Sequence, residues 1–144
     1  MNNITERDLM VGDWVQYGEN PTIKTRVLGI SSVDNGKHWH IIAEPETANS
    51  MRIVAMHAVE PIPLTAEILE KNGFEYKEAD ETCATEAFHL WHLDGSRFMM
   101  DDDSWWRSVK DGELHVKFGG FPLKYLHELQ HALRLAGIDK EITF

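Results

Sequence analysis

The dipeptide Asn35-Gly36, which stands between two β-rich runs, restricts the fold of this chain more than any other feature. Asn and Gly both accept the positive φ of a two-residue hairpin turn, so Asp34 is expected to pair with Lys37. This register predicts two cross-strand pairs, Ile30 with Ile41 and Ser31 with His40. The sequence therefore predicts an antiparallel hairpin here, with its register fixed by the turn.

The rest of the first 62 residues also reads as short strands. Val11–Gly18 is a turn followed by an alternating stretch, and Ser50–Val59 is a further strand candidate. The dipeptide Asn20-Pro21 marks a turn between the first strand and the hairpin. Four or five short strands with tight turns predict a small SH3-like β-barrel lobe over residues 1–62.

The segment PIPLTAEILEKNGF predicts a short helix over Ala66–Asn72. The Thr65 hydroxyl can cap its first turn, and Leu64 before the cap can pack on Leu69 as a hydrophobic staple. Gly73 fits the left-handed position that closes such a helix. This helix is expected to open a second lobe, residues 63–144.

Residues 74–118 are expected to form an antiparallel meander, followed by a C-terminal helix that ends at Gly137. Two dipeptides mark its turns, Asp94-Gly95 and Asp111-Gly112. Gly119-Gly120 is expected to break the chain before the helix. Pro122 is placed near the first helical position, where its missing N–H costs nothing.

The C-terminal helix carries an apolar stripe that the sheet is expected to bury. At 100° per residue the stripe consists of Leu126, Leu129, Leu133 and Ala136. The expected contacts are with the alternate strand residues Leu114, Val116 and Phe118. The whole chain is therefore predicted to be an α+β protein.

The composition indicates an acidic protein of the cytoplasm. Acidic residues number 24 and basic residues 14, which gives a formal net charge of −10. The single cysteine, Cys83, allows no disulfide within the chain, which suits a reducing compartment. We find no secretory signal and no run of about 20 apolar residues, so no membrane span is expected. Lys and Arg are scattered, and nucleic-acid binding needs them clustered.

Two stretches carry a resemblance: Glu60–Glu75, and YLHELQHALRLAGIDKEI at Tyr125–Ile142. They resemble an uncharacterised family of short proteins from gut Bacteroides-type bacteria and their prophages. Such proteins begin with a GN-V or GD-V strand, here Gly12–Val15, and end with a helix around VHxLQNLYFALTG. The resemblance implies a prophage or mobile-element origin and no known activity. The family pattern has Asn where this chain has His131.

His127-Glu128-Leu129-Gln130-His131 spells the H-E-x-x-H pattern of zinc hydrolases. A catalytic zinc site needs both histidines in a cleft and a third protein ligand. The helical stripe turns Leu129 toward the core and both histidines toward solvent, beside Lys124 and Arg134. We therefore expect a solvated polar face, and we predict no metal ligand and no cofactor.

Other candidate groups receive structural interpretations. His38 and His40 would share one strand face, whereas His89 and His92 would lie on opposite faces. Asp101-Asp102-Asp103 is typical of a solvated turn. Trp105-Trp106 are interpreted as two rings packed between sheet and helix; the alternative is that they divide between core and surface, so that one ring can anchor a partner protein. Cys83 has no adjacent basic residue to activate its thiol.

Three functions remain open. The first is a non-enzymatic protein-interaction module of a phage or mobile element, which binds another protein through an acidic surface. The second is a zinc-dependent hydrolase built on His127, Glu128 and His131. The third is a nucleic-acid-binding module that uses the N-terminal barrel. No catalytic or binding residue is assigned, and the oligomeric state is left open.

Overall fold

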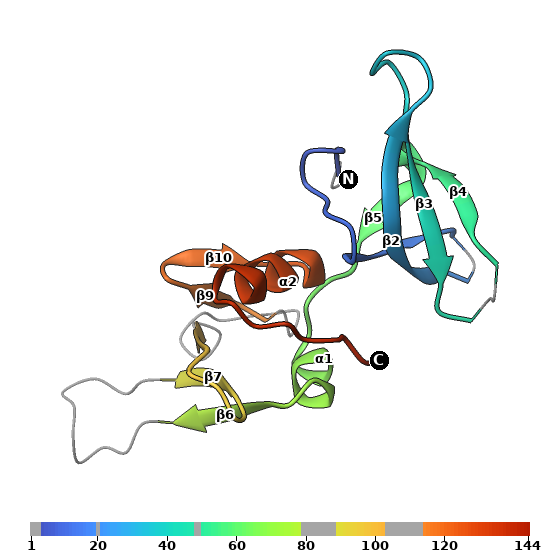
Figure 1. Ribbon diagram of the computed structural model, residues 1–144. Coiled ribbons are helices and arrows are strands. Elements are labelled where there is room, and N and C mark those ends of the chain that lie inside the picture. Colours follow the sequence, from blue (N-terminus) through green and yellow to red (C-terminus); the bar gives the residue numbers. More distant parts are fainter. Residues whose placement is uncertain (1–3, 20, 48–49, 79–88, 103–113) are drawn as a thin grey trace. The chain divides into compact units, whose positions relative to one another are not determined.

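The computed structural model (Figure 1) describes residues 4–19, 21–47, 50–78, 89–102 and 114–144. The chain divides into two compact units, Met1–Ile62 and Pro63–Phe144. Each unit contains one five-stranded antiparallel sheet, and the two α-helices of the described residues belong to the second unit. The predicted α+β class is confirmed.

The N-terminal unit is a meander that returns to its first strand. Its elements are β1 (Trp14–Tyr17), β2 (Ile23–Ser32), β3 (Trp39–Pro45), β4 (Arg52–Ala55), the 3-10 helix η1 (Met56–Ala58) and β5 (Val59–Pro61). The strand order is β4-β3-β2-β1-β5. Among the described residues β4 pairs only with β3, and β5 only with β1. The sheet is therefore open, and the expected closure into a barrel is not present.

The β2–β3 hairpin has the predicted register. Ile30 lies opposite Ile41, and Ser31 lies opposite His40. Asn35 and Gly36 have φ values of 56° and 86°, as a turn of the mirror-image type requires. The ladder ends at the pair Ser32–Trp39, so the loop is longer than the turn at its tip.

The Gly12-Asp13 dipeptide builds the entry to β1. Asp13 is fully buried, and its Oδ2 accepts the backbone N–H of Met10 at 2.8 Å. Gly12 has φ 94°, and its N–H donates to the carbonyl of Val27 at 2.7 Å. A carboxylate that accepts a backbone N–H within a turn stabilises that turn locally. The Gly12-Asp13 dipeptide thus has a structural role.

The C-terminal unit is a meander flanked by two helices. Its elements are α1 (Ala66–Lys71), β6 (Phe74–Glu78), β7 (His89–Leu93), β8 (Met99–Asp102), β9 (Val116–Phe118), β10 (Phe121–Leu123) and α2 (Leu126–Leu135). The strand order is β10-β9-β8-β7-β6. The predicted meander is confirmed, including the hairpin at Asp94-Gly95. Asp111-Gly112 lies outside the described residues.

The residues that cap α1, Thr65 and Gly73, are those predicted. The Thr65 hydroxyl accepts the N–H of Ile68 at 3.2 Å, and Leu64 and Leu69 are both buried. Gly73 has φ 85° and follows the last turn. The helix ends at Lys71 with Asn72 as its C-cap, one residue earlier than expected.

The Asn72 side chain also forms hydrogen bonds with the backbone near the C-terminus. This side chain is 1% exposed and makes three hydrogen bonds. Nδ2 donates to the carbonyls of Ile68 at 2.8 Å and Thr143 at 2.9 Å, and Oδ1 accepts the N–H of Thr143 at 2.7 Å. One buried amide therefore satisfies the last turn of α1 and holds Thr143, next to the buried Ile142.

The prediction for Gly119-Gly120 and Pro122 was wrong. The two glycines, with φ 57° and 87°, form the turn of a β9–β10 hairpin rather than a break before the helix. Pro122 lies in β10, opposite Lys117, and α2 begins only at Leu126. Proline is tolerated there because β10 is an edge strand with one neighbour.

The three leucines of the predicted stripe on α2 are buried as expected, whereas Ala136, the C-cap, is exposed. Leu126 and Leu129 are fully buried, and Leu133 is 2% exposed. On the sheet Val116 and Leu123 are buried, and α2 contacts β10. Gly137 has φ 74° and closes the helix. In the part of the chain that the structure describes, no helix combines the length and hydropathy needed to cross a bilayer.

Candidate functional site

The two histidines of the H-E-x-x-H segment lie side by side on α2. Their ring centroids are 5.7 Å apart, and the rings meet edge to face. The i, i+4 spacing therefore brings them together, as a helix requires.

His127 does not lie in solvent, and the prediction that it would was wrong. Its side chain is buried, at 5% exposure, and its ring stacks on Tyr125 with an interplanar angle of 7°. The buried arc of α2 is wider than the leucine stripe, because Gln130 is also 6% exposed and lies between that stripe and His127. His131, farther along the helix, is half-buried.

Glu128 closes the start of α2. Its Oε1 accepts the backbone N–H groups of Lys124 and Tyr125, both at 3.0 Å. These N–H groups precede the first turn, where the helix itself offers no acceptor. The residue that a zinc hydrolase uses beside its metal-bound water is thus a capping residue here.

A metal centre would need a third ligand beside His127 and His131. Among the described residues, no group of three or more His, Cys, Asp or Glu side chains is placed to hold a metal ion. The geometry of α2 therefore supports a packing and capping role for the segment.

Replacing Glu128 by alanine is expected to lower the free energy of unfolding by about 1–2 kcal/mol, because two backbone N–H groups lose a charged acceptor. Glu128→Gln keeps an oxygen acceptor and should cost about half of that or less. Urea unfolding of both variants measures the difference. Equal, large losses in the two variants would contradict a capping role.

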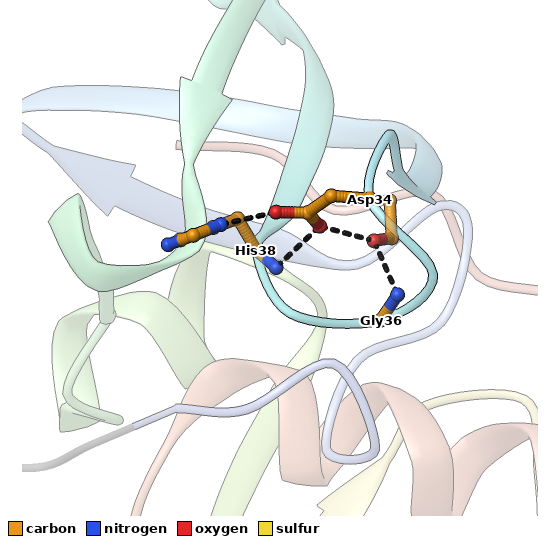
Figure 2. Close-up of polar contacts among 4 residues, drawn as sticks. Asp34, Gly36 and His38 are labelled. Atoms are coloured by element: carbon orange, nitrogen blue, oxygen red, sulfur yellow. Dashed lines mark hydrogen bonds and ion pairs between the residues drawn. The ribbon is translucent and has the colours of Figure 1, made fainter.

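The second candidate is the loop between β2 and β3, whose side chains bond to one another and to the backbone (Figure 2). Asp34 is at its centre: Oδ1 accepts the N–H of His38 at 2.7 Å and the hydroxyl of Ser32 at 3.1 Å. Its Oδ2 accepts from the His38 imidazole Nδ1. The Ser32 hydroxyl also accepts the N–H of Gly36 at 2.8 Å. We call residues 32–38, tied in this way, the hairpin loop.

His38 therefore leaves the strand face that it was expected to share with His40. It precedes β3, which begins at Trp39, and its ring turns to Asp34 (Figure 2). His40 stays on β3, opposite Ser31 and Ala55. His38 and His40 therefore do not share one strand face as expected.

The pKa of Asp34 is lowered from 3.8 to about 2, mainly by the hydrogen bond from the His38 imidazole and next by the hydrogen bond from the His38 backbone N–H. A carboxyl whose pKa is lower in the folded protein stabilises it in the ionised form. The contribution of this group is complete above pH 3.8 and is lost as the pH falls through about 2.

We expect the Asp34 carboxyl to titrate near pH 2 in a carbon-detected NMR titration, and to move toward 3.8 in His38→Gln. The remaining backbone bond keeps the shift from vanishing. His57→Gln, a change at an exposed histidine of the same unit, is the matched control and should leave Asp34 unchanged. If the titration midpoint of the Asp34 carboxyl is the same in His38→Gln as in the parent protein, the hydrogen bond from the imidazole does not form.

Several side chains of the hairpin loop are exposed to solvent, among them those of Val33 and His38. Val33 is 83% exposed, and the side chain of His38 is 78% exposed. Neither contributes to the core of the N-terminal unit, which consists of the buried residues Leu9, Val15, Val27, Ile41, Ala43, Val54, Met56 and Val59. The loop therefore holds an exposed apolar side chain at a position fixed by its own hydrogen bonds.

The acidic run is not the solvated turn that was expected. Asp101 and Asp102 belong to β8, and Asp102 is buried, where its Oδ2 accepts the indole N–H of Trp91 at 2.8 Å. Asp101 lies opposite Lys117 on β9. Asp103 lies outside the described residues.

His89 and His92 do not form a shared site. His89 bonds to the hydroxyl of Tyr76, whereas His92 Nε2 bonds to the carbonyl of Ser96 at 2.7 Å. Cys83 and the pair Trp105-Trp106 lie outside the described residues.

One surface was missed at the level of sequence. Ile42 and Ile53 lie opposite each other on β3 and β4, and the Ile42 side chain lies over Gly29 of β2. Ile53 is 77% exposed, and Met51, just before β4, is 68% exposed. We call Ile42, Met51 and Ile53 the outer row. The available sequence signal for this surface was that Met51 and Ile53 are two residues apart, so a strand places both side chains on the same face.

Comparison with known proteins finds no matching family model, no matching curated protein and no matching solved structure.

Proposed function

We propose that this chain is a non-enzymatic protein-interaction module of a phage or mobile element, acting in the cytoplasm. The observation that carries the proposal is the hairpin loop, where three side chains hold an exposed loop in one conformation around Val33. The single cysteine and the resemblance of Glu60–Glu75 and Tyr125–Ile142 support the compartment and the origin.

Pre-organisation is the reason the loop favours binding. A contact surface that is already ordered loses less conformational entropy when a partner docks. Asp34 and Ser32 order the loop from within, and the exposed Val33 adds nothing to the hydrophobic core. The network thus uses specific residues, Ser32 and Asp34, although it buries no apolar surface. We expect this of a loop that binds a partner, rather than of a loop that only connects two strands.

We further propose that the N-terminal unit is an SH3-like lobe. The order β4-β3-β2-β1-β5, with η1 between β4 and β5, supports this proposal. Such small lobes carry unrelated functions on their loops and edges, so the fold alone identifies no ligand.

The charge favours a protein partner with a basic surface. Residues 1–62 contain 8 acidic and 5 basic side chains, and residues 63–144 contain 16 and 9. A nucleic-acid backbone would be repelled by this balance. The engagement of Glu128 in the capping of α2 argues against the zinc-hydrolase alternative.

A quantitative pull-down from lysate tests the proposal. We expect a specifically enriched protein whose recovery falls at least about tenfold with Val33→Ser, because hot-spot side chains carry most of an interface's energy. Val11→Ser, which changes an exposed valine elsewhere in the same unit, is the matched control and should retain the partner. Equal recovery with both variants, at equal thermal stability, would reject the loop as the binding element.

A further inference from the structure

The chain contains two Asn-Gly dipeptides, Asn35-Gly36 and Asn72-Gly73, and the structure places them in different surroundings. An asparagine before glycine loses its side-chain amide readily, because glycine has no side chain to hinder attack by its backbone nitrogen. Asn35 is exposed in the hairpin loop, with φ 56°. Asn72 is 1% exposed, and both the nitrogen and the oxygen of its amide are hydrogen-bonded.

Loss of the amide proceeds through a cyclic imide. The Gly36 nitrogen gives up its proton to solvent base and bonds to Cγ of Asn35, the Cγ–Nδ2 bond breaks, and the amide leaves as ammonia. Water then opens the ring, either at Cγ to give aspartate or at the backbone carbonyl carbon to give isoaspartate. The reaction consumes water and releases ammonia, and no atom is oxidised or reduced.

The hairpin loop engages the nitrogen that would attack. The N–H of Gly36 donates to the Ser32 hydroxyl at 2.8 Å (Figure 2). That hydroxyl donates its own proton to Oδ1 of Asp34 at 3.1 Å, which leaves its lone pairs for Gly36. An amide that donates a hydrogen bond within the protein gives up its proton to solvent base less readily. The loop thus restrains the Gly36 nitrogen, while Asn35 itself is exposed.

At Asn72 the structure restrains the amide that would leave. Its Nδ2 donates to the carbonyls of Ile68 at 2.8 Å and Thr143 at 2.9 Å, so cyclisation would have to break both bonds in a buried site. Exposed loops open locally at a much lower free-energy cost than buried segments do. In the folded chain the reaction is therefore expected at Asn35 and not at Asn72.

We propose that Asn35 is a deamidation site whose rate is set by the Ser32 hydroxyl. Ser32 is a positioning residue, because it acts through the Gly36 nitrogen. Conversion places a second carboxylate next to Asp34 in the chain, and the isoaspartate form lengthens the backbone within the turn. Both changes disturb the hairpin loop, and the loss of ammonia makes them one-way. The reaction requires no partner protein and goes beyond the proposed function.

Peptide mapping by mass spectrometry, after incubation of the full-length protein at mildly alkaline pH, follows both dipeptides in one sample. In the folded parent protein we expect conversion at Asn35 and none at Asn72 over the same period. In urea both residues should convert, and Asn35 should convert faster than in the folded protein, because the bond between Ser32 and Gly36 is lost.

Ser32→Ala should speed conversion at Asn35 at least about threefold, as expected for the loss of one hydrogen bond, and should leave Asn72 unchanged. Ser32→Thr keeps the hydroxyl and should convert at the parent rate. Ser31→Ala, the matched control on the same strand, should also keep the parent rate.

An equal rate at Asn35 in the parent protein and in Ser32→Ala would overturn the inference. So would an equal rate at Asn35 in the folded and the urea-unfolded parent protein, because the loop would then not restrain the Gly36 nitrogen. Absence of conversion at Asn35 in both the folded parent and Ser32→Ala, with conversion in urea, would also overturn it.

Discussion

Leu129→Asp is expected to unfold the C-terminal unit. Leu129 is fully buried at the centre of the stripe that docks α2. The substitution removes about 2–5 kcal/mol of packing and adds the desolvation cost of a carboxylate. That sum is comparable with the whole stability of a small domain, about 5–15 kcal/mol. Hydrogen exchange followed by mass spectrometry should show α2 amides that exchange at the rate of an unfolded chain.

Leu135→Asp is the matched control, because it introduces the same residue into the same helix at a site that is 86% exposed. It should leave exchange within α2 close to that of the parent protein. If both variants exchange alike and slowly, α2 is not docked through its leucines.

Asn72→Ala is expected to lower the free energy of unfolding by about 2–4 kcal/mol. Three hydrogen bonds from one buried side chain are lost, each with a net value of about 0.5–1.5 kcal/mol. The chain end that carries the buried Ile142 loses its attachment in the same step. Urea unfolding, with the slope checked for constancy, measures the change.

Thr143→Ala provides the control for Asn72. The bonds between them use only the backbone of Thr143, so this substitution should be nearly neutral. A loss in Thr143→Ala as large as that in Asn72→Ala would show that side-chain packing, rather than the amide, holds the chain end.

Local signals with a stereochemical cause predicted the fold well. Asn35-Gly36 fixed the hairpin register because few residue pairs adopt two positive φ angles in succession. Thr65 and Gly73 fixed the ends of α1 for similar reasons. The same chemistry was misread at Gly119-Gly120, where a three-residue strand containing Pro122 was too short to be recognised as half of a hairpin.

The candidate sites depended on tertiary contacts, which the sequence shows poorly. Helical periodicity correctly predicted that Leu126, Leu129 and Leu133 are buried. It could not show that His127, which lies outside this stripe, is buried as well. Glu128 three residues after Tyr125 was a usable signal for helix capping. It was missed because tyrosine is not a typical residue at the start of a helix.

Polar side chains that resemble reactive groups are used here to hold backbone and neighbouring side chains. Examples are the buried or bonded groups of Asp13, Asp34, Asn72, Asp102 and Glu128.

Metal analysis by mass spectrometry, on protein purified without chelator, tests the structural role of the H-E-x-x-H segment most directly. We expect far less than one zinc per chain, with no change in His131→Ala. About one tightly held zinc per chain that disappears in His131→Ala would contradict the account, because a site would then form around the two imidazoles that we assign to packing.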